Sequence, residues 1–401
     1  MSESTITMRH LSVKDVEQYN NLLRYAFQVT EEELMEVGWE NDDIRQSKFG
    51  VLERASVLGC FDGKNLVSQF AVYPLNMNIY NAVYPIGFIT SVATYPEYSG
   101  QGLMRKLMYE SLVEMKENKQ SLALLYPYSI PLYRHRGFEI VSNKMTYAVP
   151  DRQIPKNIEV DGYVRRVSQD SKELRELHTE FARQTHGCLF RNHLAWEEYW
   201  RWDVDDTLVA IYYDSSDEPL GYMVYLIKED IMHIKEMIYL NEEGRQGLWQ
   251  YIHAHDSMID EVRGNNYFSE PIAFDLYDSD IKETIRPYVM GRIIDVEMFL
   301  SDYRFNHAAE GKALTLHVED PFLAWNNRTF HFTIHHYKAV MTDTPSSNEF
   351  ILSIGTLTTL LLGYKSADRL YKTGRIQATA QTIRLLDQIL RHEKPYISDY
   401  I

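Results

Sequence analysis

Hydrophobic residues recur with two different spacings along the first 150 positions of the chain. Residues 15–27 and 102–119 carry apolar side chains every three or four positions, which predicts amphipathic helices. A strand that feeds a helix through a glycine turn indicates a mixed α/β domain over residues 1–150. Four apolar runs rich in β-branched and aromatic residues predict strands at 56–63, 66–80, 84–96 and 121–129.

The pattern changes at two later points. Residues 150–162 are polar and contain two prolines, so they form a candidate linker. From 291 to 401 the pattern gives strands, two short helices around a glycine break, and a last amphipathic helix with a short tail, which indicates a compact α+β domain. The block between them, 151–290, combines predicted helices at 171–184, 193–203 and 245–262 with predicted strands at 207–214 and 221–240.

The two α/β blocks contain a similar segment. VATYPEYSGQGLMRKL, which begins at Val92, and MIYLNEEGRQGLWQYI, which begins at Met237, share Glu, Gln, Gly and Leu in the same register. Each segment is predicted to leave a strand and enter a helix. Arg245 stands where the first copy has Gly100, and its side chain would occupy the space that glycine leaves open. We therefore interpret the second segment as a copy kept for architecture.

The chain has 57 acidic and 41 basic residues, a formal charge of −16. This balance argues against a nucleic-acid partner, because phosphate binding needs a basic surface. It favours cationic substrates, and solubility alone would also explain many of the charges. No apolar run is long enough to predict a membrane span, and no secretory signal is recognised. Cys60 and Cys188 lack metal-binding spacing and fit a reducing cytoplasm.

The glycine turn at Gly100 and Gly102 is the strongest candidate binding site. A strand, a turn with bare amides and a helix N-terminus together favour an anion; the alternative is a tight turn that needs glycine only for its positive φ. SVATYPEYSGQGLMRKLM resembles the pyrophosphate-binding motif of the GNAT superfamily of acetyl-CoA-dependent N-acetyltransferases. The first motif position departs from the family, because it holds Glu97 in place of Arg or Gln.

The whole chain resembles the Eis-like branch of that superfamily, and LLLGYKSADRLYKTGRI resembles its sterol carrier protein-like domain. The resemblance implies two tandem GNAT-type α/β domains, catalytic over 1–150 and degenerate over 151–290, and a sterol carrier protein-like α+β domain over 291–401. It also implies acetyl-CoA as co-substrate and a homo-oligomer, a hexamer in the family. By alignment, backbone groups of the preceding strand would pair with the pantetheine arm, and the amides of the turn would bind the diphosphate. These residues are Val92, Ala93, Thr94, Gly100, Gln101, Gly102 and Leu103.

Catalysis is expected at two positions. Tyr133 in YSIPLYRHRGFE matches the family's tyrosine ahead of a Gly-aromatic pair, and would protonate the departing thiolate; Tyr126 and Tyr128 are nearby alternatives. In the Eis-like branch the C-terminal carboxylate enters the active site, which implies that Ile401 supplies the base. The apolar end of the tail suits burial.

The acidic segment 30–43 could receive a cationic substrate through Glu32, Glu33, Glu36 and Trp39, with Glu31 beside them; a solvated acidic face is the alternative. His331, His335 and His336 are assigned a structural role, and no metal is expected, because strand alternation separates adjacent residues.

The resemblance thus implies an acetyl-CoA-dependent N-acetyltransferase that acetylates amino groups of cationic substrates by direct transfer, either aminoglycoside-like polyamines or lysine side chains of proteins. The alternative is a non-catalytic sensor whose C-terminal domain binds an apolar ligand. Release of free CoA only when an amine is added would separate the two.

Overall fold

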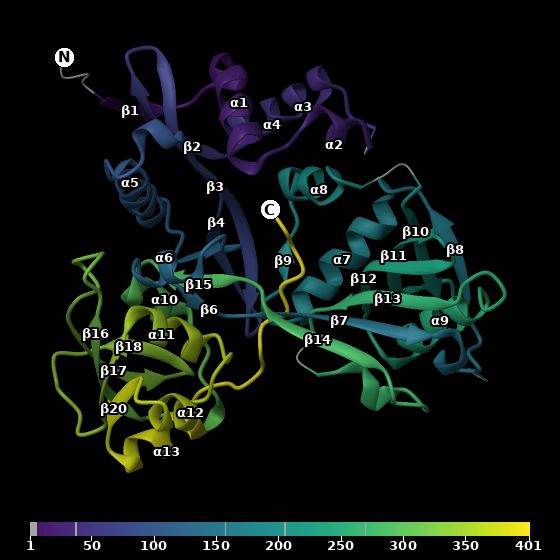
Figure 1. The fold of residues 1–401 in the computed structure, drawn as a ribbon. Helices are drawn as coiled ribbons and strands as arrows, with labels where there is room; N and C mark the ends of the chain where they lie inside the picture. The colour runs from purple at the N-terminus through teal and green to yellow at the C-terminus, as the bar shows by residue number, and fades with distance from the viewer. Residues whose placement is uncertain (1–5, 37, 157, 204–205, 269) are drawn as a thin grey trace.

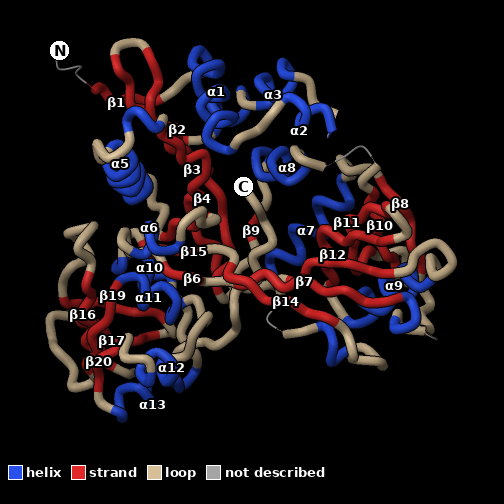
Figure 2. Tube along the Cα trace, in the orientation of Figure 1, coloured by secondary structure: helices blue, strands red, loops and turns tan. Residues whose placement is uncertain are grey.

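The computed structural model describes residues 6–36, 38–156, 158–203, 206–268 and 270–401. These residues form three β-sheets, each packed against helices (Figure 1). Figure 2 shows the same arrangement by secondary structure, with strands in red and helices in blue. The mixed α/β class predicted from the hydrophobic pattern is confirmed.

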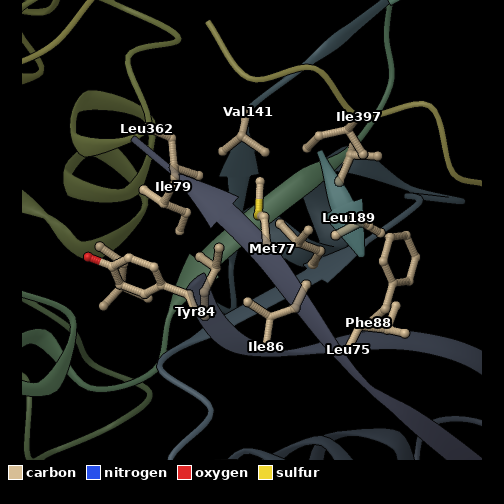
Figure 3. Packing of buried hydrophobic residues seen from close by; sticks show 14 of the residues in the cluster. Leu75, Met77, Ile79, Tyr84, Ile86, Phe88, Val141, Leu189, Leu362 and Ile397 are labelled. Carbon is tan, nitrogen blue, oxygen red and sulfur yellow. The ribbon is translucent and has the colours of Figure 1, made fainter. Parts of the chain in front are cut away.

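The first sheet has the order β1-β2-β3-β4-β5-β15-β6, and β9 pairs with β3 at one side. Neighbouring strands run antiparallel except β4 and β5, which are parallel. Figure 3 shows how Met77 and Ile86 of this sheet pack against Leu189 and the tail residue Ile397. The strands are β1 (Ile6–His10), β2 (Ser56–Asp62), β3 (Asn65–Ile79), β4 (Ala82–Thr94), β5 (Leu122–Leu125), β6 (Glu139–Ile140), β9 (Leu189–Phe190) and β15 (Met290–Ile293).

The helices at 15–27 and 102–119 are confirmed as α1 (Val16–Phe27) and α5 (Leu103–Glu117). The region between α1 and β2 contains three short helices that the sequence pattern did not predict. Each has only six or seven residues, and α2 and α3 are mostly polar, so the hydrophobic periodicity is weak. These helices are α2 (Glu31–Glu36), α3 (Asn41–Ser47) and α4 (Phe49–Arg54); η1 (Val13–Asp15), η2 (Pro96–Tyr98) and α6 (Ile130–Arg134) complete this part.

The second sheet has the order β14-β7-β13-β12-β11-β10-β8, and its one parallel pair in the described residues is β12 with β13. The helix predicted over 245–262 is wrong at both ends. It begins at Glu242 and ends at His253, and residues 261–266 form a strand. The elements are β7 (Asn143–Pro150), η3 (Asp151–Gln153), β8 (Tyr163–Val167), α7 (Lys172–Gln184), α8 (His193–Trp200), β10 (Leu208–Tyr213), β11 (Pro219–Lys228), β12 (Ile231–Tyr239), α9 (Glu242–His253), β13 (Glu261–Asn266), η4 (Ile272–Asp275) and β14 (Lys282–Pro287).

The two larger sheets exchange strands. β15 follows β14 in the chain but joins the first sheet, and β7 follows β6 but joins the second. Where the two chain segments cross, the amide of Val141 donates to the carbonyl of Val289 at 2.9 Å, and the amide of Tyr288 donates to Ser142 at 3.0 Å. The pairing therefore continues from one sheet into the other.

The third sheet has the order β18-β17-β16-β19-β20. The predicted strand, helix, glycine break and second helix are confirmed, with Gly363 at φ +71° after the first helix. The elements are α10 (Val296–Asp302), η5 (His307–Ala309), β16 (Ala313–Glu319), β17 (Thr329–His335), β18 (Lys338–Met341), β19 (Glu349–Ser353), α11 (Ile354–Leu361), α12 (Ala367–Lys372), β20 (Ile376–Ala378) and α13 (Ala380–Ile389).

After α13 the chain leaves the third sheet and runs back between the other two, so that the C-terminus lies near β3, β4 and α8 (Figure 1). The amide of Tyr396 donates to the carbonyl of His186 at 2.8 Å on the way. In the described part of the chain, every helix is too short or too polar to cross a bilayer.

Candidate active site

A buried ion cluster fixes the tail just before its end. Arg191, which lies between β9 and α8, donates through Nε to Asp399 at 2.6 Å and through Nη2 to Glu236 of β12 at 2.7 Å. All three side chains are at most 2% exposed. Ser398 and Tyr222 complete the cluster by hydrogen bonds to Arg191 and Glu236. The last buried residue of the tail is therefore linked, through Arg191, to Glu236 of the second sheet.

The two carboxylates of this cluster are not equivalent. Burial alone would raise the pKa of Glu236, but the charge and hydrogen bonds of Arg191 outweigh it and hold that pKa well below its usual value. Burial raises the pKa of Asp399 in spite of its bond to Arg191. The negative charge that balances Arg191 therefore lies on Glu236 first, and Asp399 takes up a proton more readily.

Beyond Asp399, the chain ends in a large cavity between the first and second sheets. The cavity has a volume of about 1180 Å³, and Ile401 and Tyr400 line it together with Ser91 of β4 and Tyr126. The Tyr126 ring packs between Tyr400 and Tyr288, with ring centroids 5.0 and 5.5 Å apart. The carboxylate of Ile401 thus belongs to a residue that lines the cavity beside the edge of β4.

Strand β4 is irregular where it borders the cavity. Its register with β3 shifts between Gln69 and Ala71, and Ser91 has φ +55°. The hydroxyl of Tyr19 donates to Ser91 Oγ at 2.8 Å and holds this irregular residue from α1. Pairing of β4 with β5 ends at Ile89, although β4 continues to Thr94. On the β5 side, the β4 backbone from residue 90 to 94 thus has no neighbouring strand in the described chain.

The glycine turn follows directly. Gly100 has φ +79° and Gly102 has φ +75°, and a Cβ atom at either would meet nothing within 4 Å. Glycine is therefore required here by backbone conformation, and the space above the turn is open. In the described structure the amides of residues 100–105 form no hydrogen bond to a protein acceptor. Arg105 and Lys106 are exposed in the first turn of α5, so this end of β4 presents bare N–H groups and positive charge.

The second copy lacks this turn. Helix α9 begins at Glu242, directly after β12, because the side chain of Asn241 accepts the amide of Gly244 and caps it. Gly247 lies inside the helix against the ring of Tyr212, and Arg245 pairs with Glu242 at 2.6 Å. The obstruction by Arg245 stays a prediction; the structure adds that the amides of Gly244 and Arg245 already donate to Asn241.

The acidic segment is divided by the structure. Glu33 and Glu36 of α2 line the cavity. Glu32 is exposed outside its lining, and the indole N–H of Trp39 donates to the carbonyl of Arg201 at 2.8 Å. The lining as a whole contains as many basic as acidic side chains among the described residues, so it is mixed in charge rather than acidic.

The tyrosines also separate. Tyr133 of α6 is 6% exposed, contacts Phe138 edge to face, and belongs to the apolar cluster between α5 and the first sheet. Burial raises the pKa of Tyr133 to about 12. Tyr126 lines the cavity instead, and Tyr128 is fully exposed. Tyr133 therefore lies on the α5 side of the sheet, where the glycine turn is, and not in the lining of the cavity.

Several lining residues carry no signal in the sequence. Lys235 of β12 donates to Asp203 at 2.6 Å, and Glu198 of α8 pairs with Arg201 at 2.8 Å. Both pairs come from the second α/β block. Glu198 and Arg201 are three residues apart at the end of α8, whereas Lys235 and Asp203 are distant in the sequence. That Glu198 and Lys235 line the cavity depends on how the two sheets pack, which no local pattern reports. Lys144 and Arg286, which also line the cavity, are of this kind.

Two other candidate sites receive no support from the described residues. No group of three or more His, Cys, Asp or Glu side chains is placed to hold a metal ion in the described structure. The apolar space inside the third domain, between β16, α11 and α13, has a volume of about 10 Å³. That volume is about one water molecule and is too small for a lipid.

Family models match three consecutive parts of the chain. Residues 7–141 and 187–293 each match an acetyltransferase (GNAT) domain, and residues 296–398 match a sterol carrier protein domain. None of the curated proteins compared with the chain matches it significantly.

Solved structures match nearly the whole chain. A probable N-acyltransferase from Enterococcus faecalis has 26% identity and a TM-score of 0.89, and covers 99% of this chain and 100% of its own. A GCN5-related N-acetyltransferase from Anabaena variabilis (23%, TM-score 0.86) and Eis1 from Mycobacterium abscessus (18%, TM-score 0.82) also cover 99% of this chain and 100% of their own. The last two share the fold.

Proposed function

Because this chain is an acetyltransferase of the GNAT superfamily with the domain arrangement of Eis, we propose that it acetylates primary amines with acetyl-CoA. The acceptor enters as an ammonium cation; aminoglycoside-like polyamines and lysine side chains of proteins are the two candidate classes. The observation that carries the proposal is the position of Ile401. Ile401 lines a cavity that borders the part of β4 without a β5 partner. The chain then continues from β4 to the bare amides of the glycine turn.

The coenzyme would bind along β4. Backbone groups of Val92, Ala93 and Thr94 lie beyond the last pair that β4 forms with β5, which leaves them available to an extended amide-bearing chain such as pantetheine. Its diphosphate would then reach the amides of residues 100–103, with Arg105 and Lys106 nearby. Glu97 is exposed and is given no role.

The acceptor must lose a proton before it reacts. A primary amine has a pKa of about 10, so roughly 4 kcal/mol separates it from its neutral form at pH 7. The Ile401 carboxylate accepts this proton, directly or through water, and Glu33 and Glu36 attract the cation. The amine nitrogen then attacks the thioester carbonyl carbon, the C–S bond breaks, and the thiolate takes a proton from the Tyr133 hydroxyl. The proton that the nitrogen loses on becoming an amide passes through water to the Tyr133 phenolate, which restores the hydroxyl.

The proposal is tested with a panel of amines incubated with acetyl-CoA and the full chain. We expect free thiol to appear only when an amine is present, and mass spectrometry to show one added acetyl group per thiol. Binding of acetyl-CoA without any amine-dependent thiol would favour the sensor hypothesis. Two further proposals have their own tests. Mass photometry of the purified chain tests a homohexamer, and fractionation of cells that express it tests a cytoplasmic location. Cys60 and Cys188 are free and buried, as a reducing compartment allows.

We expect Gly102→Val to weaken acetyl-CoA binding by about tenfold or more. A β-branched residue at φ +75° is strained by about 1–2 kcal/mol, and relief of that strain would turn the amides away from the diphosphate. Isothermal titration calorimetry measures the affinity. Gly311→Val is the matched control, because Gly311 has φ +71°, equally open surroundings and a place in the third domain. Equal affinities of the two variants would contradict the assigned site.

We expect Tyr133→Phe to lower kcat about 10²-fold at saturating substrates. The effect is at the low end for acid catalysis because a thiol with a pKa near 8.5 needs only modest assistance at neutral pH. Tyr126→Phe is the comparison, since Tyr126 lines the cavity but lies between Tyr400 and Tyr288. Steady-state kinetics that showed the larger loss for Tyr126→Phe would transfer the role to that residue.

A further inference from the structure

One wall of the cavity carries positive charge that the protein does not neutralise. Lys144 of β7 and Arg286 of β14 are direct partners in the antiparallel register, and both line the cavity. Like charges placed opposite each other on one face of a sheet repel. In the described structure neither side chain forms a hydrogen bond or ion pair with the protein; Lys144 Nζ lies only over the rings of Tyr267 and Tyr288, 5.7 and 5.8 Å from their centroids.

The neighbouring charges of this wall are treated differently. Lys235 is paired with Asp203, and Glu236 is paired with Arg191. Burial, together with repulsion from Lys235, lowers the pKa of Lys144. The structure thus pairs Lys235 and Glu236 and leaves the cross-strand cations, the half-buried Lys144 and the exposed Arg286, without a counter-ion from the described protein.

Hydrogen-bond donors extend the same face. Because strand residues alternate between faces, Thr146 and Thr284 lie on the side of Lys144 and Arg286, and they are also direct partners. Both threonines line this cavity and the adjoining one of about 610 Å³, where Lys282 continues the row. Two cations and two hydroxyls side by side are the chemistry that binds a carboxylate or a phosphate.

The position of this face relates it to the acceptor. The rings of Tyr400, Tyr126 and Tyr288 contact one another in sequence, and Lys144 lies over the last of them. The cations are therefore across a row of aromatic rings from the C-terminal residue. An acceptor that spans this distance would place its amine near Ile401 and its other end near Lys144 and Arg286.

We propose that Lys144 and Arg286 bind an anionic group of the acceptor, so that the substrate is an amine that also carries a carboxylate or phosphate. This inference rests on the proposed function and narrows it. A polycation would bring its further positive charges toward two cations without partners, and such substrates are therefore disfavoured.

The test compares amines that differ only in the anion. L-lysine is compared with cadaverine, which lacks the carboxylate, and glucosamine 6-phosphate with glucosamine. We expect kcat/KM to be at least about tenfold higher for the anionic member of one or both pairs, as charge-assisted hydrogen bonds allow. The pair that shows the preference identifies the anion as carboxylate or phosphate.

The variant Lys144→Gln/Arg286→Gln should remove the preference by lowering kcat/KM for the anionic member alone. Arg263→Gln is the control, because Arg263 lies on the adjacent strand β13 but is already paired with Glu261 at 2.6 Å. Inorganic phosphate should raise the melting temperature of the parent protein more than that of the double variant, a readout independent of turnover.

The outcomes separate the two proposals. If no amine of the wider panel releases thiol, the proposed function fails. If amines are acetylated but cadaverine and glucosamine match or exceed their anionic partners, the anion site is overturned and acetyl transfer stands. An equal response of parent and double variant to phosphate would likewise overturn the site.

Discussion

Deletion of Tyr400 and Ile401 should lower kcat by about 10²–10⁴-fold and leave the melting temperature unchanged. The deletion removes the carboxylate that we assign as the base. A loss of kcat of this size is typical when a general base is removed. The fold should persist because Tyr400 is 56% exposed and Asp399, which carries the anchor to Arg191, remains. Steady-state kinetics with an amine identified in the panel, together with thermal denaturation, measures both quantities.

A C-terminal extension by two glycines is the matched variant. It keeps every side chain of the tail and moves only the carboxylate away from Ile401. We expect it to lose as much activity as the deletion. Full activity of the extended protein would show that Ile401 acts through its side chain or its backbone, and a general base would then have to be sought among the other lining residues, beginning with Glu33 and Glu36.

Replacement of Arg191 by Met should lower the free energy of unfolding by about 3–5 kcal/mol. Arg191 is the cation between Glu236 and Asp399, and its loss leaves two buried carboxylates without a cationic partner. The cluster also joins the tail to the second sheet, so activity should fall even at temperatures where the protein remains folded. Urea denaturation gives the stability, and kcat at low temperature gives the catalytic effect.

A triple variant that makes all three residues of the ion cluster uncharged distinguishes the effect of lost charge from that of lost packing. Arg191→Met combined with Glu236→Gln and Asp399→Asn leaves no uncompensated charge, and we expect it to recover a large part of the lost stability. If Arg191→Met alone cost less than about 1 kcal/mol, the ion cluster would have to be open to water in solution, contrary to the burial of its three side chains.

Local features of the site could be predicted from the sequence. The glycine turn was found because Gly100 and Gly102 stand directly before a pattern that predicts a helix, where glycine is unfavourable. The earlier helix start in the second copy could also have been predicted, from Asn241 rather than from Arg245, the residue used in the sequence argument. Asn241 is a favourable N-cap residue and stands where the first copy has Pro96, so it signals that the second helix begins earlier.

The wall that carries Lys144 and Arg286 could not be predicted in this way. The two residues are far apart in the sequence and become cross-strand partners because β7 and β14 join the same sheet. The cluster of Arg191, Glu236 and Asp399 likewise brings together three distant segments. Hydrophobic periodicity reports which face of an element is buried, but it carries no information about which element lies opposite.

The crossing of β6–β7 over β14–β15 has a consequence for how this protein can be divided. A fragment that ends near residue 150 would lack β15 and would carry β7 with no sheet to receive it. Such a fragment exposes unpaired strand edges, and we expect it to aggregate rather than to fold as a smaller enzyme. Loss or recombination of one half in evolution would meet the same obstacle, because the chain segment of each half supplies a strand to the sheet of the other.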